Sequence, residues 1–143
     1  IKDEAVVAPL RERMQAAMER TAQNRRMTVV VAIAYGGRWD IAEAARELAR
    51  RCVAGQMSSD AIDEAAIGAQ VALAGLPDPD LLIRTGGDQR ISNFLLWNLA
   101  YTELYFCDTL WPDFGDAELA EAIEHFSRRQ RRFGLVPQQA ETR

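Results

Sequence analysis

The 143-residue sequence contains little cysteine and almost no histidine. Cys52 and Cys107 are distant, form no C-x-x-C motif and have no paired histidine, and the single histidine is His125. Zinc sites need clusters of such ligands, so the sequence argues against one. We expect both thiols to be buried and free. His125, within a predicted helix, is expected to be a bystander.

The sequence also lacks a long apolar run, a signal peptide and an excess of positive charge. The longest apolar run, residues 27–35, is far too short to span a bilayer, and the N-terminus carries no apolar leader segment. Seventeen basic and 21 acidic residues give a net charge of −4, which argues against a nucleic-acid-binding protein. We therefore expect a cytoplasmic protein. Because it begins at Ile1, not methionine, and enters a helical pattern at once, we expect part of a longer chain.

What is present is an alternation of helical and strand patterns. Apolar spacing and capping residues predict helices over residues 4–23, 40–53, 61–73, 94–101 and 117–133. Strands are predicted over residues 27–35, 80–84 and 103–106, the first of them apolar throughout, as in a central parallel strand. The alternation predicts an α/β fold, a mostly parallel sheet flanked by helices. Residues 1–143 are expected to form the C-terminal portion of one domain, with further strands upstream.

A polar cluster follows the predicted strand 80–84. Arg84 and Arg90 carry planar guanidiniums suited to phosphate oxygens, and Gly86-Gly87 lets the backbone bend close to a ligand. Ser92-Asn93 opens a predicted helix, whose first N–H groups favour anions. These features predict a diphosphate site. The alternative is that the arginines pair with surface carboxylates and the glycines form an ordinary turn. No lysine followed by serine or threonine comes after Gly86-Gly87, which excludes a Walker A loop.

Four motifs occur in order along the chain: YGGRWD at residues 35–40, DLLIRTGGDQRISNFLLWNLAYTELYF at 80–106, LWPDF at 110–114 and RRFG at 131–134. Together they resemble the C-terminal signature of the cis-prenyltransferases, of the bacterial undecaprenyl-diphosphate-synthase type. The resemblance implies an enzyme that condenses isopentenyl diphosphate onto an allylic diphosphate, farnesyl diphosphate by expectation, with cis geometry. It further implies magnesium, an apolar product tunnel, and a long undecaprenyl product that serves as a cell-wall lipid carrier.

The resemblance also implies roles for particular residues. Arg84, Arg90 and Ser92 would be the catalytic residues that bind the diphosphate of isopentenyl diphosphate, and Glu103 would help to hold magnesium. The remaining implied substrate-binding residues are Gly86, Gly87, Asp88, Trp111, Asp113, Arg132 and Gly134. From the residues alone, Glu103 could instead be an exposed carboxylate at a strand start, Asp113 a turn residue and Trp111 a core aromatic.

The assembly expected from the resemblance is a homodimer, in which Arg132 and Gly134 reach the partner's active site and residues 94–106 form part of the interface. Transient contact with a membrane surface during product release is also possible for such an enzyme. Met27, Val29 and Val31 could line the product tunnel or belong to an ordinary core. The length of the product is not readable from this sequence.

The sequence departs from the family pattern in two places. Asp88-Gln89 stands where the family often has Glu-His, which puts any histidine-dependent metal contact in doubt. The Asp-Gly-Asn-Gly-Arg-Trp loop of the family's allylic site is absent, so these 143 residues alone are expected to be inactive. Two rival interpretations are a non-catalytic subunit of a two-component prenyltransferase and a phosphate- or nucleotide-binding regulatory module.

Overall fold

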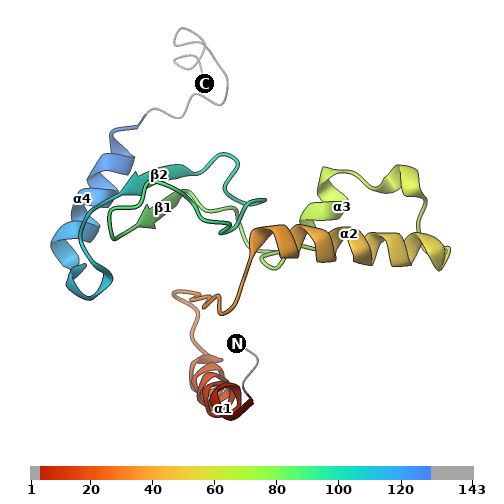
Figure 1. Ribbon diagram of the computed structural model, residues 1–143, viewed down its shortest axis with the longest axis horizontal. Coiled ribbons are helices and arrows are strands. Elements are labelled where there is room, and N and C mark those ends of the chain that lie inside the picture. The colour runs from red at the N-terminus through yellow and green to blue at the C-terminus, as the bar shows by residue number, and fades with distance from the viewer. Residues whose placement is uncertain (1–3, 130–143) are drawn as a thin grey trace, which may run out of the picture. The chain divides into compact units, whose positions relative to one another are not determined.

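The computed structural model describes residues 4–129 (Figure 1). The chain divides after Tyr35 into a short N-terminal unit and a larger second unit that begins at Gly36. Each unit is described by itself below. No helix among residues 4–129 combines the length and the apolar character needed to cross a membrane.

The N-terminal unit consists of one helix and an extended segment. Helix α1 spans Glu4–Thr21 and confirms the helix predicted over residues 4–23. The strand predicted over residues 27–35 does not form, and its apolar side chains are exposed: Met27 by 76% and Val29 by 75%. A strand is held by hydrogen bonds to a neighbouring strand, and within the described residues this segment pairs with none.

The second unit contains the remaining regular elements. In chain order they are α2 (Gly37–Val53), η1 (Ser59–Ala61), α3 (Glu64–Gly68), β1 (Leu81–Arg84), β2 (Glu103–Phe106), η2 (Trp111–Asp113) and α4 (Asp116–Ser127).

Strands β1 and β2 form a two-stranded parallel sheet, which confirms both predicted strands and their orientation. Leu81 lies opposite Glu103, and Arg84 lies opposite Phe106. The ladder extends beyond both ends, because the Glu103 N–H donates to the Asp80 carbonyl at 3.1 Å and the Cys107 N–H to the Arg84 carbonyl at 3.0 Å. Helix α4 packs against β2 (Figure 1). The sheet therefore has the helix-covered, parallel character that the sequence predicts.

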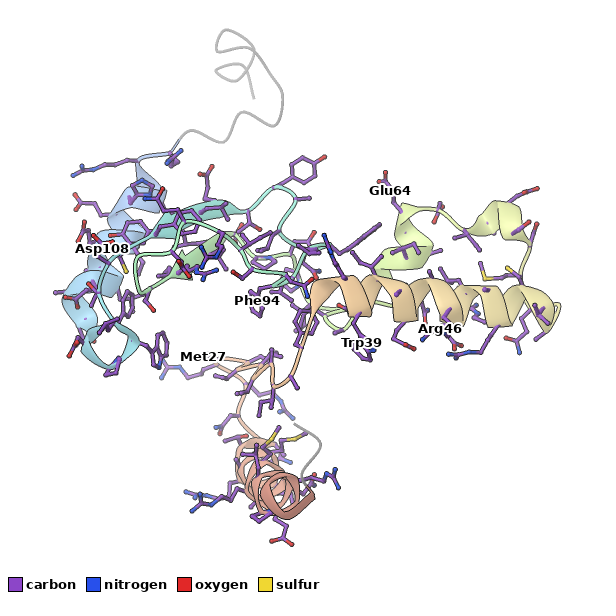
Figure 2. The ribbon with its side chains drawn as sticks, in the orientation of Figure 1. Met27, Trp39, Arg46, Glu64, Phe94 and Asp108 are labelled. Carbon is purple, nitrogen blue, oxygen red and sulfur yellow. The ribbon has the colours of Figure 1, made fainter. Side chains whose placement is uncertain are left out.

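Helix α2 buries one side against α3 and the segment that follows it. Ala44 and Leu48 are each 1% exposed, and Val71 is 3% exposed. Trp39 and Arg46 project from the other side of α2 (Figure 2). The buried Asp40 carboxylate accepts the Ala72 N–H at 2.9 Å, which fastens the start of α2 to the chain beyond α3.

Two predicted helices differ from the structure. The helix predicted over residues 61–73 is reduced to α3, because Asp63 caps it by accepting the Ala66 N–H at 2.8 Å and the chain turns after Gly68. The helix predicted over residues 94–101 does not form. Asn93 has φ +64 and Leu95 has φ +43. These left-handed conformations cannot continue a right-handed helix, so the segment folds into successive turns.

Helix α4 also begins differently from the prediction. It starts at Asp116, one residue before the predicted start, its N-cap is Gly115, and the Glu118 carboxylate accepts the Gly115 N–H at 2.8 Å. This contact lowers the pKa of Glu118 below its usual value. The helix ends at Ser127, and residues 130–133 of the predicted helix lie outside the described residues.

Candidate functional site

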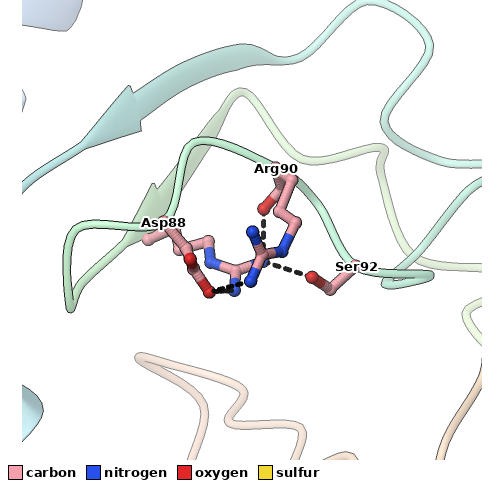
Figure 3. Close-up of polar contacts among 4 residues, drawn as sticks. Asp88, Arg90 and Ser92 are labelled. Carbon is pink, nitrogen blue, oxygen red and sulfur yellow. Dashed lines mark hydrogen bonds and ion pairs between the residues drawn. The ribbon is translucent and has the colours of Figure 1, made fainter.

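Four polar residues meet at the carboxyl end of β1 (Figure 3). Arg84 Nη2 donates to Asp88 Oδ2 at 2.6 Å, and Arg84 Nη1 donates to Ser92 Oγ at 2.7 Å. The same Nη1 donates to the Arg90 carbonyl. Arg90 Nη2 donates to Asp88 Oδ2 at 2.7 Å. We call Arg84, Asp88, Arg90 and Ser92 the arginine cluster. The structure thus brings together the three residues predicted to be catalytic.

The two glycines of the cluster loop have a conformational role. Gly86 has φ +86 and Gly87 has φ +81, a region that other residues rarely adopt. Their N–H groups donate to the Thr109 carbonyl at 2.9 Å and the Cys107 carbonyl at 3.0 Å. The loop is therefore pinned to the segment after β2. Both N–H groups donate to carbonyls of the protein itself. The close approach of the Gly86-Gly87 backbone to a ligand remains a prediction.

The electrostatics of the cluster favour an anion. It holds two guanidiniums and one carboxylate, a formal charge of +1 on a chain whose net charge is −4. The Arg84 side chain is 24% exposed, that of Asp88 41% and that of Arg90 66%. The accessible positive charge is therefore mostly that of Arg90, while Arg84 lies deeper and is held by three acceptors.

Asn93 connects the cluster to α2, a role that sequence reasoning missed. Its backbone carbonyl accepts the Gly37 N–H at 2.7 Å, and its side-chain Oδ1 accepts the Arg38 N–H at 2.9 Å. Asn93 therefore satisfies the first N–H groups of α2 from a distant part of the chain, as a capping residue does locally. The predicted helix start at Ser92-Asn93, with its anion-binding N–H groups, is wrong.

The sequence signal for this contact is the pair Gly36-Gly37 in the YGGRWD motif. A Cβ added at Gly36 would lie 2.9 Å from Asn93 Nδ2, and one at Gly37 would lie 2.7 Å from Leu96 Cγ. Gly37 is needed because the Leu96 backbone approaches it this closely, whereas at Gly36 the nearest atom is the end of the Asn93 side chain. The YGGRWD motif is thus joined to the loop that carries Ser92.

Glu103 lies away from the arginine cluster. It starts β2, whereas Arg84 ends β1, which separates them along the sheet by three residues, about 10 Å at the usual rise. Side chains alternate between faces of a strand, so Glu103 shares the face of Tyr105 and Arg84 does not. Glu103 Oε2 instead lies 3.8 Å from Nη1 of Arg129, two residues after the end of α4.

The α4 face of β2 holds a second group of polar side chains. The Tyr105 and His125 rings lie 5.2 Å apart, and partial burial, followed by a hydrogen bond to Glu121, raises the pKa of Tyr105. His125 Nδ1 is buried and has no hydrogen-bond partner among the described residues. Neither side chain contacts the arginine cluster, consistent with His125 as a bystander to that site.

Within residues 4–129, no hydrogen bond, ion pair or ring contact joins Trp111 or Asp113 to the arginine cluster. Trp111 and Asp113 lie in η2, where Trp111 stacks on Phe114 with ring centroids 6.1 Å apart and is 76% exposed. Trp111 is therefore not a core aromatic. Arg132 and Gly134 lie outside the described residues.

A hollow of about 280 Å³ adjoins the arginine cluster. Its walls combine Arg84 and Ser92 with four apolar side chains, those of Leu82, Ile83, Ile91 and Phe94. A site of this kind offers charge at one side and hydrocarbon contact at the other.

Residues 4–129 of one copy do not bring together enough side-chain ligands to form a magnesium site by themselves. Residues 4–129 contain no group of three or more Asp, Glu, His or Cys side chains that could hold a metal. Magnesium in phosphate-binding enzymes is commonly held by one or two carboxylates and the substrate's own phosphates. Glu103 offers one hard oxygen ligand, but within one copy it lies three residues along the sheet from Arg84 and on the opposite face, so it would not share an ion with a diphosphate on that same Arg84.

Comparisons with known proteins extend this description. The family model described as putative undecaprenyl diphosphate synthase matches residues 2–134. The ditrans,polycis-undecaprenyl-diphosphate synthase ((2E,6E)-farnesyl-diphosphate specific) of Xanthomonas axonopodis pv. citri is 56% identical over 132 residues, which cover 92% of this chain and 51% of that protein. An isoprenyl transferase of Chlorobaculum tepidum is 44% identical over 139 residues, which cover 97% of this chain and 52% of that protein. The chain spans about half the length of the curated relatives it matches.

Two solved structures are similar to the present one. Lavandulyl diphosphate synthase from Lavandula x intermedia, in complex with dimethylallyl diphosphate, matches with a TM-score of 0.82 and 43% identity, over 87% of this chain and 54% of that one. A probable undecaprenyl diphosphate synthase from Campylobacter jejuni matches with a TM-score of 0.70 and 32% identity. The match covers 94% of this chain and 61% of that one. The α/β fold predicted from the sequence is therefore confirmed.

Proposed function

Because the chain belongs to the undecaprenyl diphosphate synthase family of cis-prenyltransferases, we propose that it supplies the isopentenyl-diphosphate half of a prenyltransferase active site. The whole enzyme would condense isopentenyl diphosphate onto an allylic diphosphate with cis geometry. The observation that carries the proposal is the convergence of Arg84, Arg90 and Ser92 at the end of β1. Farnesyl diphosphate as the allylic substrate and undecaprenyl diphosphate as the product follow the names of the curated relatives.

The chemistry of the cluster suits this role. Guanidinium groups bind phosphate oxygens through paired N–H groups and stay charged at all working pH values. Arg84, held by three acceptors, would provide a fixed contact, and the more exposed Arg90 would close on the ligand. Ser92 Oγ would add a hydroxyl contact. The adjoining apolar hollow would take the five-carbon isopentenyl group.

Magnesium dependence of the whole enzyme is part of the proposal, with Glu103 as one oxygen ligand from this chain. When bound, the ion would offset the negative charge of a diphosphate. In one copy Glu103 and the arginine cluster do not form a common metal site, so the roles described here for Arg84, Arg90 and Ser92 do not depend on the ion.

We propose a cytoplasmic homodimer that touches a membrane surface when a long lipid product leaves, and whose product serves cell-wall synthesis. Within that dimer Asp113 and Trp111 would lie near the site, and Arg132 and Gly134 would reach the partner's active site. The exposure of Trp111 and of Tyr101, 76% and 83%, leaves aromatic surface available for such contacts.

Isothermal titration separates this function from its rivals. The chain is expected to bind isopentenyl diphosphate more tightly than ATP, since the hollow beside Arg84 has apolar walls suited to a short hydrocarbon. Tighter binding of ATP would favour a nucleotide-binding module. The absence of binding to either compound would favour a non-catalytic subunit. Incorporation of labelled isopentenyl diphosphate into lipid by these 143 residues alone would contradict the expectation that they are inactive.

A further inference from the structure

Asp88 occupies an unexpected position in the arginine cluster. A single oxygen, Asp88 Oδ2, accepts from Arg84 Nη2 at 2.6 Å and from Arg90 Nη2 at 2.7 Å (Figure 3). We propose that Asp88 is an internal competitor of the bound diphosphate, not one of its ligands. This inference rests on the proposed function, because it assigns a role within the same site.

The contact chemistry supports competition. Carboxylate and phosphate oxygens are both acceptors for the guanidinium fork, and an ionised carboxylate has no proton to donate to a phosphate oxygen. Asp88 Oδ2 lies between the two guanidiniums that a diphosphate would need. The ligand must therefore take over these contacts, and the carboxylate must turn away from it.

The two arginines respond differently to that exchange. Arg84 keeps its bonds to Ser92 Oγ and to the Arg90 carbonyl, so its position does not depend on Asp88 alone. Asp88 is the one described residue with which the Arg90 guanidinium forms an ion pair, and the Arg90 side chain is 66% exposed. Displacing Asp88 thus releases Arg90 to follow the ligand. When the diphosphate leaves, the ion pair between Asp88 and Arg90 re-forms, which favours release of the diphosphate.

The test uses inorganic diphosphate as the titrant and the substitution Asp88→Asn. The variant keeps the size of the side chain and one acceptor oxygen but removes the competing charge. The dissociation constant is expected to fall by about three- to tenfold, the range that two partly exposed ion pairs give. Asp88→Ala, which removes the acceptor as well, is expected to lower the dissociation constant in the same way.

Asp108→Asn is the matched control. It removes the same charge from the neighbouring segment, where Asp108 Oδ1 would lie 3.3 Å from a Cβ at Gly87, and among the described residues Asp108 forms no ion pair with either arginine. A change below about twofold is expected there, since an exposed carboxylate that pairs with neither guanidinium acts on them only through solvent of high dielectric constant.

Three outcomes overturn the inference. Unchanged or weaker binding by the Asp88 variants would make Asp88 a ligand or a positioning residue. Equal tightening by Asp108→Asn would show a general charge effect instead of competition. Failure of every variant and of the unaltered chain to bind diphosphate would overturn the proposed function as well, whereas the first two outcomes would leave it standing.

Discussion

Arg84 and Arg90 differ in how far the protein already uses their hydrogen-bonding capacity. A guanidinium has five N–H donors, and Arg84 places three of them on Asp88, Ser92 and the Arg90 carbonyl, while the Arg90 side chain donates to Asp88. Arg84 therefore organises the loop in addition to offering charge. Sequence reasoning identified both arginines but treated them as equivalent, because residue type does not show how many donors are engaged.

This difference predicts unequal effects on stability. Arg84→Ala removes three donors, one of them from the partly buried Asp88 carboxylate and two from exposed acceptors, and is expected to lower the free energy of unfolding by about 1–3 kcal/mol. Arg90→Ala breaks one exposed pair and should change it by less than about 0.5 kcal/mol. Urea denaturation of the two variants measures both values. Equal losses of stability would contradict the unequal roles.

The isolated carboxylate of Glu103 predicts weak metal binding. One oxygen ligand beside the Arg129 guanidinium is too few for a magnesium site in the absence of phosphate. Calorimetric titration of the ligand-free chain with magnesium is expected to give no saturating curve, for the unaltered chain and for Glu103→Gln alike. A saturating curve that Glu103→Gln abolishes would show that the chain gathers a metal site by itself.

At the scale of elements, helices and strands form as predicted where the apolar pattern suits them and a neighbouring element packs or pairs with them. Strands β1 and β2 and helices α1, α2 and α4 lie near their predicted positions. The segment 94–101 fails because its apolar residues look helical while Asn93 and Leu95 adopt left-handed conformations. Those conformations accompany the docking of the start of α2 on Asn93. This long-range contact leaves no signal within residues 94–101 themselves.

The contact between the start of α2 and residue 96 makes Gly37 sensitive to substitution. In Gly37→Ala the added Cβ would lie 2.7 Å from Leu96 Cγ and 2.9 Å from the Leu96 backbone nitrogen, so a loss of about 1–3 kcal/mol of stability is expected. Gly68→Ala is the control, because its nearest contact is 3.4 Å and its stability should change by less than about 1 kcal/mol. Thermal unfolding compares the two, and similar melting temperatures would contradict the close approach.

The start of α4 predicts an acid-sensitive contribution to stability. The Gly115 N–H lowers the pKa of Glu118 from its usual 4.5, so the carboxylate stabilises the folded chain above that value. The contribution is lost as pH falls through the lowered pKa, because the protonated group binds the N–H less strongly. Melting temperature measured against pH is expected to fall less steeply below about 4.5 in Glu118→Gln. Parallel profiles would exclude this contact as a source of acid sensitivity.

At the scale of the whole molecule, the sequence predicted the α/β class, the two paired strands and the residues of the arginine cluster. It did not predict that residues 27–34 would be exposed and unpaired in this structure. Apolar, β-branched composition reports how well residues suit a strand, but a strand forms only with a neighbour. Similarly, the family resemblance implied Glu103 as a magnesium ligand, and only the register of β1 and β2 showed its distance from Arg84.

The net charge of −4 and the local charge of the cluster act at different scales. Net charge governs long-range attraction and solubility, whereas a bound diphosphate responds to the guanidiniums within hydrogen-bonding distance. An acidic chain can therefore carry an anion site. The site is positioned by the sheet end, by the turn at Gly86-Gly87 and by the link from Asn93 to α2.

The dissociation constant for isopentenyl diphosphate, compared between the unaltered chain and Arg90→Ala, tests the central claim most directly. Arg46→Ala is the control, since Arg46 is a similarly exposed arginine paired with Glu43 on α2. The arginine cluster predicts binding that Arg90→Ala weakens by about ten- to a hundredfold, the value of losing charged hydrogen bonds, and that Arg46→Ala leaves unchanged. Equal affinities of Arg90→Ala and the unaltered chain would contradict the assignment of this cluster as the diphosphate site.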